Sequence, residues 1–314
     1  KMQHWVDSTL AKHQIDKVFV YSSSMAQYCH GEQYNKLERA IDFVDVDSDK
    51  WRQYAEKKSG LAKWVYQREY KLLGQVEDTI CRAFDHSLFV SPDEAQLFRD
   101  RQKESDKAKV SGILNGVDVA FFDPNATFID EPLLPTTSFI SFTGAMDYWA
   151  NIDAVVWFVK HVWPLVSVKH PSAKFVIAGG NPSAEVLALA EVEGVIVTGR
   201  VVDVRPFIAN AKCVVAPLRI ARGIQNKVLE AMALDKPIVC TSMAMEGINA
   251  PASEQVHIHD DASMFAQICS RYLSDKEVID IEKGGNRNWI FQQFTWQHTL
   301  EPLKQLYNAK VSEK

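Results

Sequence analysis

The sequence predicts an α/β protein built on parallel sheets, and three observations support that fold class. Beyond residue 137, short apolar runs alternate strictly with helix-forming segments, as in a doubly wound sheet. Two of these runs, at 213–217 and 237–241, are short, β-branched and bounded by a proline, which is typical of buried parallel strands. Three others end in glycines, at Gly144, Gly180 and Gly199, which leave the backbone free to approach a ligand.

The composition is that of an ordinary globular protein. The chain has 314 residues, of which 46% are hydrophobic and 24% are charged, so it is long enough for two domains with their own cores. A net charge of −5 argues against a nucleic-acid partner, because such proteins concentrate basic residues on one face. No apolar run is long enough to span a bilayer, and the first residues do not resemble a signal peptide. We therefore expect a cytoplasmic protein that is soluble or peripheral to a membrane.

The cysteines and histidines predict neither disulfides nor a metal site. The five cysteines are far apart and form no C-x-x-C pair, so we expect small buried side chains in a reducing compartment. The pair His257 and His259 lies on one face of an expected strand, but no third ligand is in view, and an exposed strand end is the preferred interpretation.

The first part of the chain predicts four strands and the helices between them. Helices are expected at 2–13, 61–84 and 92–99, and strands at 17–21, 41–46, 87–90 and 109–114. Asp45 and Asp47 close the second strand and are candidate catalytic carboxylates, because loops at the carboxyl ends of parallel strands carry the chemistry. Solvated turns and helix caps are the alternative interpretation of these residues.

The second part is introduced by a segment at 123–137 that holds three prolines and no periodicity, which indicates a linker. Strands are then expected at 138–143, 174–179, 194–199, 212–217, 237–241 and 255–259. The expected helices lie at 150–166, 182–191, 203–210, 225–235 and 242–248, and the chain is expected to be helical from about 261.

The stretch 219–241 indicates a binding site for an anion. Between 211 and 229 there are four basic residues and no acidic one, although the chain as a whole is acidic. The helix expected from Gln225 adds its unpaired amides and its dipole, so a phosphate fits its start. Glu230 follows Asn226 on the same helical face, and a carboxylate beside phosphates more plausibly accepts hydrogen bonds from sugar hydroxyls. The stretch therefore suggests a nucleotide site; an ordinary helix start with a solvated glutamate is the alternative.

A set of short motifs gives this pattern a family resemblance. In order they are Asn115-Gly-Val-Asp118, Phe-Thr-Gly144, Ala-Gly-Gly180, Thr-Gly199, Ala-Pro217 and Leu229-Glu230-Ala-Met-Ala, followed by Pro237-Ile-Val. The set covers most of residues 110–250 and resembles glycosyltransferase family 4. Further pieces, such as Met146-Asp-Tyr148, resemble the bacterial sugar transferases associated with exosortase and exopolysaccharide systems.

The resemblance implies a GT-B fold, in which two Rossmann-like domains face each other across a cleft. It also implies retaining transfer from a nucleoside-diphosphate sugar, with no metal or other cofactor, and a donor site in the C-terminal domain. Glu230 matches the second glutamate of the family's pair, which binds the ribose. Arg222 stands where the first glutamate faces the donor sugar.

A second departure concerns the charge at the diphosphate. The family places an arginine and a lysine after the first glycine of the donor domain, and the segment after Gly144 has neither. We predict that Arg219, Arg222 and Lys227 supply the charge instead. The donor-binding residues expected on these grounds are Gly144, Gly180, Gly199, Arg200, Arg219, Gly223, Gln225, Asn226, Lys227 and Glu230, and the catalytic ones are Asp45, Asp47 and Arg222, with no metal ligand.

The resemblance also divides the chain. We expect an incomplete acceptor-side domain at 1–122 that lacks roughly 80 residues by the size of a doubly wound domain. The linker at 123–137 follows, then the nucleotide-sugar domain at 138–280, and helices at 281–314 that pack back on the first domain.

The expected function is transfer of a sugar to a polysaccharide or lipid-linked acceptor, with possible peripheral contact at the inner membrane. The partners are then a nucleotide sugar and a glycan or lipid-linked acceptor. Two alternatives stay open: a nucleotide-sugar epimerase, and a non-catalytic nucleotide-sugar-binding or scaffold protein.

Overall fold

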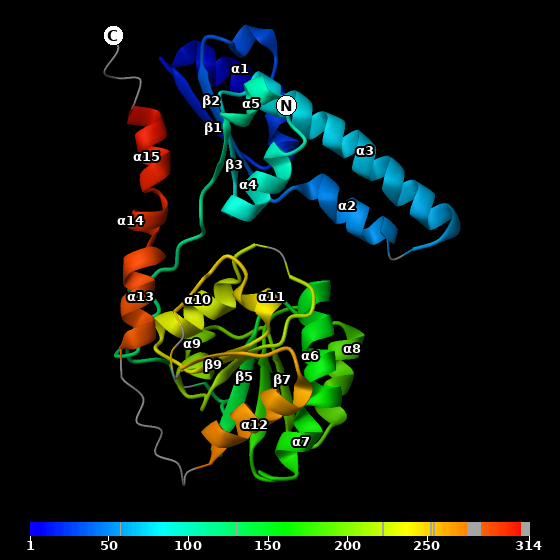
Figure 1. Cartoon of the computed structure of the whole chain (residues 1–314). Coiled ribbons are helices and arrows are strands. Elements are labelled where there is room, and N and C mark those ends of the chain that lie inside the picture. Colours follow the sequence, from blue (N-terminus) through cyan, green and yellow to red (C-terminus); the bar gives the residue numbers. More distant parts are fainter. Residues whose placement is uncertain are drawn as a thin grey trace. The chain divides into compact units, whose positions relative to one another are not determined.

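Two α/β units, each with a parallel sheet, make up the chain in the computed structural model, which describes residues 1–56, 58–129, 131–221, 223–251, 253, 255–274 and 284–308 (Figure 1). The first unit is 1–114 with the residues from Gln305 onward, and the second is 115–304. The predicted α/β class with parallel sheets is confirmed. The segment 123–137 belongs to the second unit, and its described residues form neither helix nor strand.

The first unit has a four-stranded sheet in the order β1-β2-β3-β4, with every pair parallel. The strands are β1 (Lys17–Tyr21), β2 (Glu38–Val44), β3 (His86–Phe89) and β4 (Val110–Gly112). The other elements are α1 (Met2–Lys12), η1 (Ser23–Tyr28), η2 (Glu32–Tyr34), α2 (Asp47–Glu56), α3 (Gly60–Ala83), α4 (Pro92–Arg99) and α5 (Glu104–Lys107).

Strand β2 begins three residues and ends two residues earlier than the sequence predicts. It starts at Glu38 and stops at Val44, which has a left-handed φ of 71°. The Asp42 carboxylate accepts the Val44 amide at 2.8 Å and fixes this turn. Asp45 and Val46 therefore leave the sheet, and the apolar side chain of Val46 continues the core rather than the strand.

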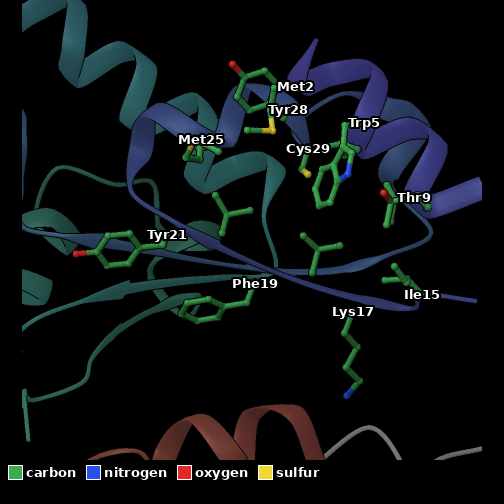
Figure 2. Close-up of a pocket in the computed structure, with 14 residues that line it drawn as sticks. Met2, Trp5, Thr9, Ile15, Lys17, Phe19, Tyr21, Met25, Tyr28 and Cys29 are labelled. Carbon is green, nitrogen blue, oxygen red and sulfur yellow. The ribbon is translucent and has the colours of Figure 1, made fainter. Parts of the chain in front are cut away.

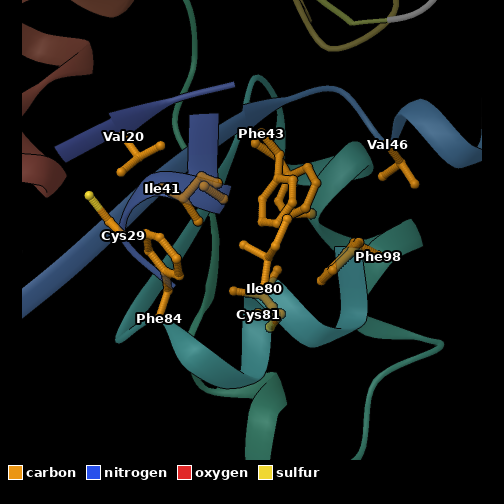
Figure 3. Packing of buried hydrophobic residues seen from close by; sticks show 13 residues of the cluster. Val20, Cys29, Ile41, Phe43, Val46, Ile80, Cys81, Phe84 and Phe98 are labelled. Carbon is orange, nitrogen blue, oxygen red and sulfur yellow. The ribbon is translucent and has the colours of Figure 1, made fainter. Parts of the chain in front are cut away.

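The core of the first unit lies where β2 and β3 meet α3 and α4 (Figure 3). The rings of Phe43 and Phe89 stack with centroids 5.2 Å apart, and Phe98 of α4 lies 4.7 Å from Phe89. The C-terminal turns of α3 contribute Ile80 and Cys81 to the same cluster. The buried apolar side chains of the strands thus find their packing partners within the first unit.

The second unit has a six-stranded parallel sheet in the order β10-β9-β8-β5-β6-β7. The strands are β5 (Phe139–Thr143), β6 (Lys174–Ala178), β7 (Val195–Gly199), β8 (Val214–Ala216), β9 (Ile238–Cys240) and β10 (Val256–Ile258). This is the order of a Rossmann sheet. The strand order reverses between β5 and β8, and in such sheets ligands bind in the crevice beyond the carboxyl ends of those strands.

The helices of the second unit follow the predicted alternation, with shorter bounds. They are α6 (Trp149–His161), α7 (Trp163–Ser167), α8 (Ala184–Ala188) with η3 (Leu189–Glu191), α9 (Arg205–Ala209), α10 (Asn226–Ala233), α11 (Ser242–Met245), α12 (Ala262–Leu273), α13 (Gly285–Gln293) and α14 (Trp296–Thr299); α15 (Glu301–Asn308) continues past the unit boundary. The single helix expected at 150–166 is two, because Pro164 starts a new helix at α7.

Helix α13 packs on α10 within the second unit. Arg287 of α13 donates hydrogen bonds to the carbonyl oxygens of Val119 at 2.8 Å and Phe122 at 2.6 Å. Val117 also forms a parallel bridge with Thr295. These contacts tie the segment that opens the second unit to the helices that close it. Among the described helices, none is long and apolar enough to cross a bilayer.

Candidate functional site

A pocket of about 590 Å³ opens at the carboxyl edge of the second sheet. Its walls are the loops that follow β5 and β6, Arg200 after β7, and the first turns of α10. These loops come from both sides of the point where the strand order reverses, which is the position where Rossmann sheets bind ligands.

The loops after β5 and β6 approach each other so closely that one position must be glycine. A Cβ added to Gly179 would lie 1.7 Å from the carbonyl oxygen of Gly144, which is far inside van der Waals contact. The next residue, Gly180, has room, since its Cβ would meet only the end of the Arg200 side chain at 3.6 Å. Any side chain at position 179 would therefore push the two loops apart.

Lys227, in the first turn of α10, is the buried cation of the pocket. Only 9% of its surface is exposed, and its Nζ donates a hydrogen bond of 2.6 Å to the Asn151 side-chain oxygen. The same nitrogen lies 4.8 Å from the centre of the Phe142 ring. Asn151, itself buried, uses its amide nitrogen on the Ala145 carbonyl at 2.9 Å, so its oxygen is held toward the lysine.

Burial acts on both ionisable groups of α10. Burial lowers the pKa of Lys227 to about 8, and the nearby Glu230 carboxylate offsets only part of that effect. Burial raises the pKa of Glu230, again partly offset by Lys227. A cation with a lowered pKa gains most from an anionic ligand, because the ligand restores the charge that burial disfavours.

The start of α10 offers further groups for an anion. Its N-cap residue, Gln225, makes no side-chain cap to the helix amides and instead donates to the Gly223 carbonyl at 3.0 Å. Because Gln225, Asn226 and Lys227 line the pocket, the positive end of the helix dipole faces it. Arg200 also lines the pocket, and its guanidinium donates to the Asn181 oxygen at 3.3 Å.

Most of the residues that the sequence predicts for donor binding do line this pocket. They are Gly144, Gly180, Arg200, Gln225, Asn226, Lys227 and Glu230. Gly199 and Gly223 lie next to the lining in the chain and adopt left-handed φ values of 69° and 62°. Their roles toward a ligand stay predictions.

Arg219 has a partner that the sequence does not reveal. Its guanidinium forms two contacts with the Asp153 carboxylate of α6, at 3.1 and 2.5 Å. The charge of Arg219 is thus largely compensated, and the side chain is not among the lining residues. Arg222, the third predicted cation, lies outside the described residues.

Asp45 and Asp47 belong to the first unit, where both pair with Lys50. The Lys50 nitrogen lies 3.0 Å from Asp45 and 2.9 Å from Asp47. Burial lowers the pKa of Lys50, but the two carboxylates outweigh burial and raise it overall. Their catalytic role stays a prediction.

Asn151 is the site residue that the sequence reasoning missed. It lies in the first turn of α6, and no charge or motif marks it. The available signal is the packing requirement of Lys227: a lysine on a buried helix face needs a polar acceptor from a neighbouring element.

The remaining candidates do not form a second chemical site. His257 pairs with the Tyr272 hydroxyl at 2.8 Å, and the described residues hold no group of three His, Cys, Asp or Glu side chains placed to bind a metal. All five cysteines are buried and free, as predicted. A pocket of about 610 Å³ between α1 and β1 is lined mainly by apolar side chains such as Trp5, Met25 and Tyr28 (Figure 2). Its one cationic lining residue, Lys17, is paired with Glu38 at 3.3 Å, and we assign no ligand to this pocket.

The comparison with known families decides the assignment of the second unit. Residues 137–275 match the model of the family described as glycosyl transferases group 1. This segment is therefore similar to the group 1 glycosyl transferases. The pocket and all its lining residues lie inside the matched segment.

A protein described as an uncharacterized 44.6 kDa protein in the cps region of Klebsiella pneumoniae is 24% identical over 184 residues. The match covers 55% of this chain and 45% of that protein, so the chain matches less than half of this curated relative.

Solved glycosyltransferase structures share the fold, which confirms the predicted GT-B class. Sucrose-phosphate synthase from Thermosynechococcus elongatus has a TM-score of 0.71 at 15% identity, with 100% of this chain and 78% of that chain covered. Anabaena HepE, solved with UDP-glucose, has a TM-score of 0.67 at 13% identity, with coverages of 97% and 82%. Staphylococcus aureus TarM, solved with UDP and α-GlcNAc-glycerol, has a TM-score of 0.67 at 12% identity, with coverages of 92% and 55%.

Proposed function

We propose that this protein transfers a sugar from a nucleoside-diphosphate sugar to a polysaccharide or lipid-linked acceptor, with retention of configuration at the anomeric carbon. The observation that carries the proposal is that Lys227 and Glu230 share one pocket at the point where the strand order reverses. The match of the pocket-bearing segment to the model of the group 1 glycosyl transferases supports the same conclusion.

The diphosphate and the ribose of the donor are assigned to two different parts of the pocket. The start of α10, Lys227 and Arg200 are proposed to hold the diphosphate, since they bring the helix amides and two cations to one place. Glu230 is proposed to accept hydrogen bonds from the ribose hydroxyls. A carboxylate next to phosphates would be repelled by them, whereas a diol offers it two donors.

The chemical step needs positioning and charge stabilisation. The bond between the anomeric carbon and the diphosphate oxygen breaks, and a bond to the acceptor hydroxyl oxygen forms on the same face. The acceptor proton passes to the departing diphosphate, so no separate general base is required. Lys227 and the helix dipole stabilise the negative charge that grows on that diphosphate. Arg222 is proposed to assist there, and Asp45 and Asp47 to contact the acceptor.

The proposal assigns no metal or other cofactor, because protein cations supply the charge compensation. Transfer is then expected to continue in the presence of a chelator such as EDTA. We place the reaction in the cytoplasm, at the inner face of the membrane. The position of the K. pneumoniae relative in a cps region supports a polysaccharide acceptor.

The first experiment is a thermal-shift panel with UDP, GDP and ADP, because a ligand that binds only the folded state raises the melting temperature. UDP is the first candidate, since HepE and TarM were solved with uridine nucleotides. We expect one nucleotide to raise the melting temperature of the wild type and not of Lys227→Met. No shift with any of the three would overturn the proposed donor site.

The second experiment follows a labelled sugar nucleotide together with a candidate acceptor. Label that moves to the acceptor with its anomeric configuration kept, as read by NMR, supports retaining transfer. Label that returns in an isomerised sugar nucleotide identifies an epimerase instead. Binding without either product leaves the non-catalytic alternative and rejects the transfer.

A further inference from the structure

The outward face of α3 in the first unit is apolar and exposed. Five large side chains on this face are exposed: Leu61 at 77%, Trp64 at 60%, Val65 at 38%, Leu72 at 43% and Val76 at 50%. Their positions recur at helical spacing, so they form one stripe that runs from the start of the helix to its fifth turn and is interrupted by Arg68. We call these five residues the α3 stripe.

The packing of the first unit uses the other side of α3. Helix α2 lies along it in the hairpin that α2 and α3 form (Figure 1), and the rings of Trp51 and Tyr54 contact Tyr66 with centroids 5.6 and 6.0 Å away. Further along, Ile80 and Cys81 face the core. The α3 stripe is therefore not the face that holds the helix in the fold.

Basic residues accompany the stripe. Between 58 and 71 there are four basic residues, Lys58, Lys63, Arg68 and Lys71, and one acidic residue, Glu69. Glu69 forms an ion pair of 3.0 Å with Arg68, and the other three basic side chains are exposed. This local excess of positive charge stands against a chain whose net charge is −5.

We propose that α3 attaches the first unit to the surface of an anionic lipid bilayer. The helix lies parallel to the surface, with Leu61, Trp64 and Leu72 inserted among the acyl chains near the headgroups. Lys58, just before the helix, and Lys71, at the edge of the stripe, contact lipid phosphates, whereas Lys63 lies on the opposite side of the helix. An amphipathic helix with an apolar stripe, a tryptophan and flanking lysines has the chemistry that membrane interfaces bind.

Charge favours this occupant over a second copy of the chain. Two copies that met stripe to stripe would bring two sets of basic residues together, and the repulsion would oppose the apolar contact. An anionic surface instead satisfies the apolar and the basic residues at once. The inference rests on the proposed location at the inner face of the membrane and adds the surface that attaches the chain there. Its test measures lipid binding by the first unit and does not depend on the nucleotide pocket.

The experiment measures flotation of the purified chain with vesicles of equimolar phosphatidylglycerol and phosphatidylcholine, and with vesicles of phosphatidylcholine alone. We expect binding to the anionic vesicles that is about tenfold stronger than to the neutral ones, and that falls at about 0.5 M salt. The variant Leu61→Glu/Trp64→Glu is expected to lose this binding. Val202→Glu, which changes an exposed apolar residue of the second unit, is the matched control and should bind as the wild type does.

The variant must also be shown to fold. Both substituted side chains are exposed, so the melting temperature and the nucleotide-dependent thermal shift should match those of the wild type. A wild type that fails to bind anionic vesicles overturns the proposal, as does a folded Leu61→Glu/Trp64→Glu variant that still binds them. Self-association that the variant abolishes, without vesicle binding by the wild type, assigns the stripe to a second copy and also overturns it.

Discussion

The side chain of Asn151 holds Lys227 by a hydrogen bond of 2.6 Å that joins α6 to the first turn of α10. Because the asparagine amide nitrogen is committed to the Ala145 carbonyl, its oxygen has a fixed direction and the lysine nitrogen has a fixed place. Asn151 is thus a positioning residue for the cation of the pocket.

Asn151→Ala is expected to weaken nucleoside-diphosphate binding about tenfold, which corresponds to about 1.4 kcal/mol, because the lysine loses its fixed place. Isothermal titration calorimetry with the nucleotide selected by the thermal-shift panel measures this change. Asn210→Ala is the control, since Asn210 likewise donates one side-chain hydrogen bond, at 2.9 Å to the Pro206 carbonyl, but lies outside the pocket lining. Equal losses in the two variants would show that Asn151 acts only on stability.

Lys227→Met is expected to stabilise the protein without ligand at pH 7. The pKa of Lys227 is about 8 in the folded protein and 10.5 for an ordinary lysine, as in the unfolded chain. Between pH 8 and 10.5 the unfolded chain therefore keeps a proton on this lysine that the folded protein has lost. The free energy of unfolding of the wild type therefore rises with pH through that window and is lowest below it. The lowered pKa costs the wild type about 3 kcal/mol of unfolding free energy at pH 7. Lys227→Met removes this cost but also loses the Asn151 hydrogen bond, which offsets about 1 kcal/mol of the gain.

We therefore expect a gain of about 2 kcal/mol for Lys227→Met at pH 7, shrinking toward zero near pH 10. Urea denaturation at several pH values measures it. A variant that is less stable than the wild type at pH 7 would contradict this expectation, because it would show that burial of Lys227 does not lower the free energy of unfolding of the ligand-free protein.

The affinity for the nucleotide should also depend on the protonation of Lys227, but it should fall as the pH rises. Below about pH 8 Lys227 is protonated and binds the diphosphate, and above that value the free protein must first take up a proton. Affinity of the wild type should then fall by up to about tenfold per pH unit above 8, until the pKa of the complex is reached. Calorimetry from pH 7 to 10 tests this, and in Lys227→Met the decline should disappear.

The sequence alone predicts the strands of the second unit's sheet and the two central residues of the pocket, Lys227 and Glu230. Helix α10 lies within the expected range 225–235 and buries Val228, Leu229, Met232 and Ala233, while Glu230 lines the pocket with Lys227. Both follow from local periodicity and from the position of the helix after a buried strand, which a sequence states directly.

Side-chain partners between distant elements could not be derived in that way. Asp153 lies 66 residues before Arg219, and no local pattern joins them, so a residue chosen as a phosphate ligand proves to be paired. The same reason hides Asn151, which is 76 residues from Lys227. The apolar spacing of α3 shows a further limit: periodicity indicates which residues share a face, but not whether that face is buried.

The paired state of Arg219 leads to a graded expectation. Because Asp153 already compensates its charge, Arg219→Ala should reduce nucleotide affinity by no more than about threefold, which is the effect expected of an exposed ion pair. Lys227→Met should cost more than about tenfold, since it removes a buried charge that faces the ligand. The two affinities are compared by calorimetry at pH 7. A larger loss for Arg219→Ala would mean that the arginine leaves Asp153 for the phosphate when ligand binds.

Glu230 should determine whether the pocket distinguishes ribose from deoxyribose. If its carboxylate accepts hydrogen bonds from the ribose hydroxyls, the wild type should bind the nucleoside diphosphate about tenfold more tightly than its 2′-deoxy form. In Glu230→Ala the two ligands should bind equally, because the group that reads the hydroxyl is gone. Glu185→Ala, at an exposed glutamate of α8, is the control and should keep the wild-type preference. Calorimetric titration of both ligands into the three proteins supplies the comparison. A preference that persists in Glu230→Ala would place the ribose elsewhere. The half-buried carboxylate would then have to be explained by Lys227, whose charge lowers the Glu230 pKa against the effect of burial.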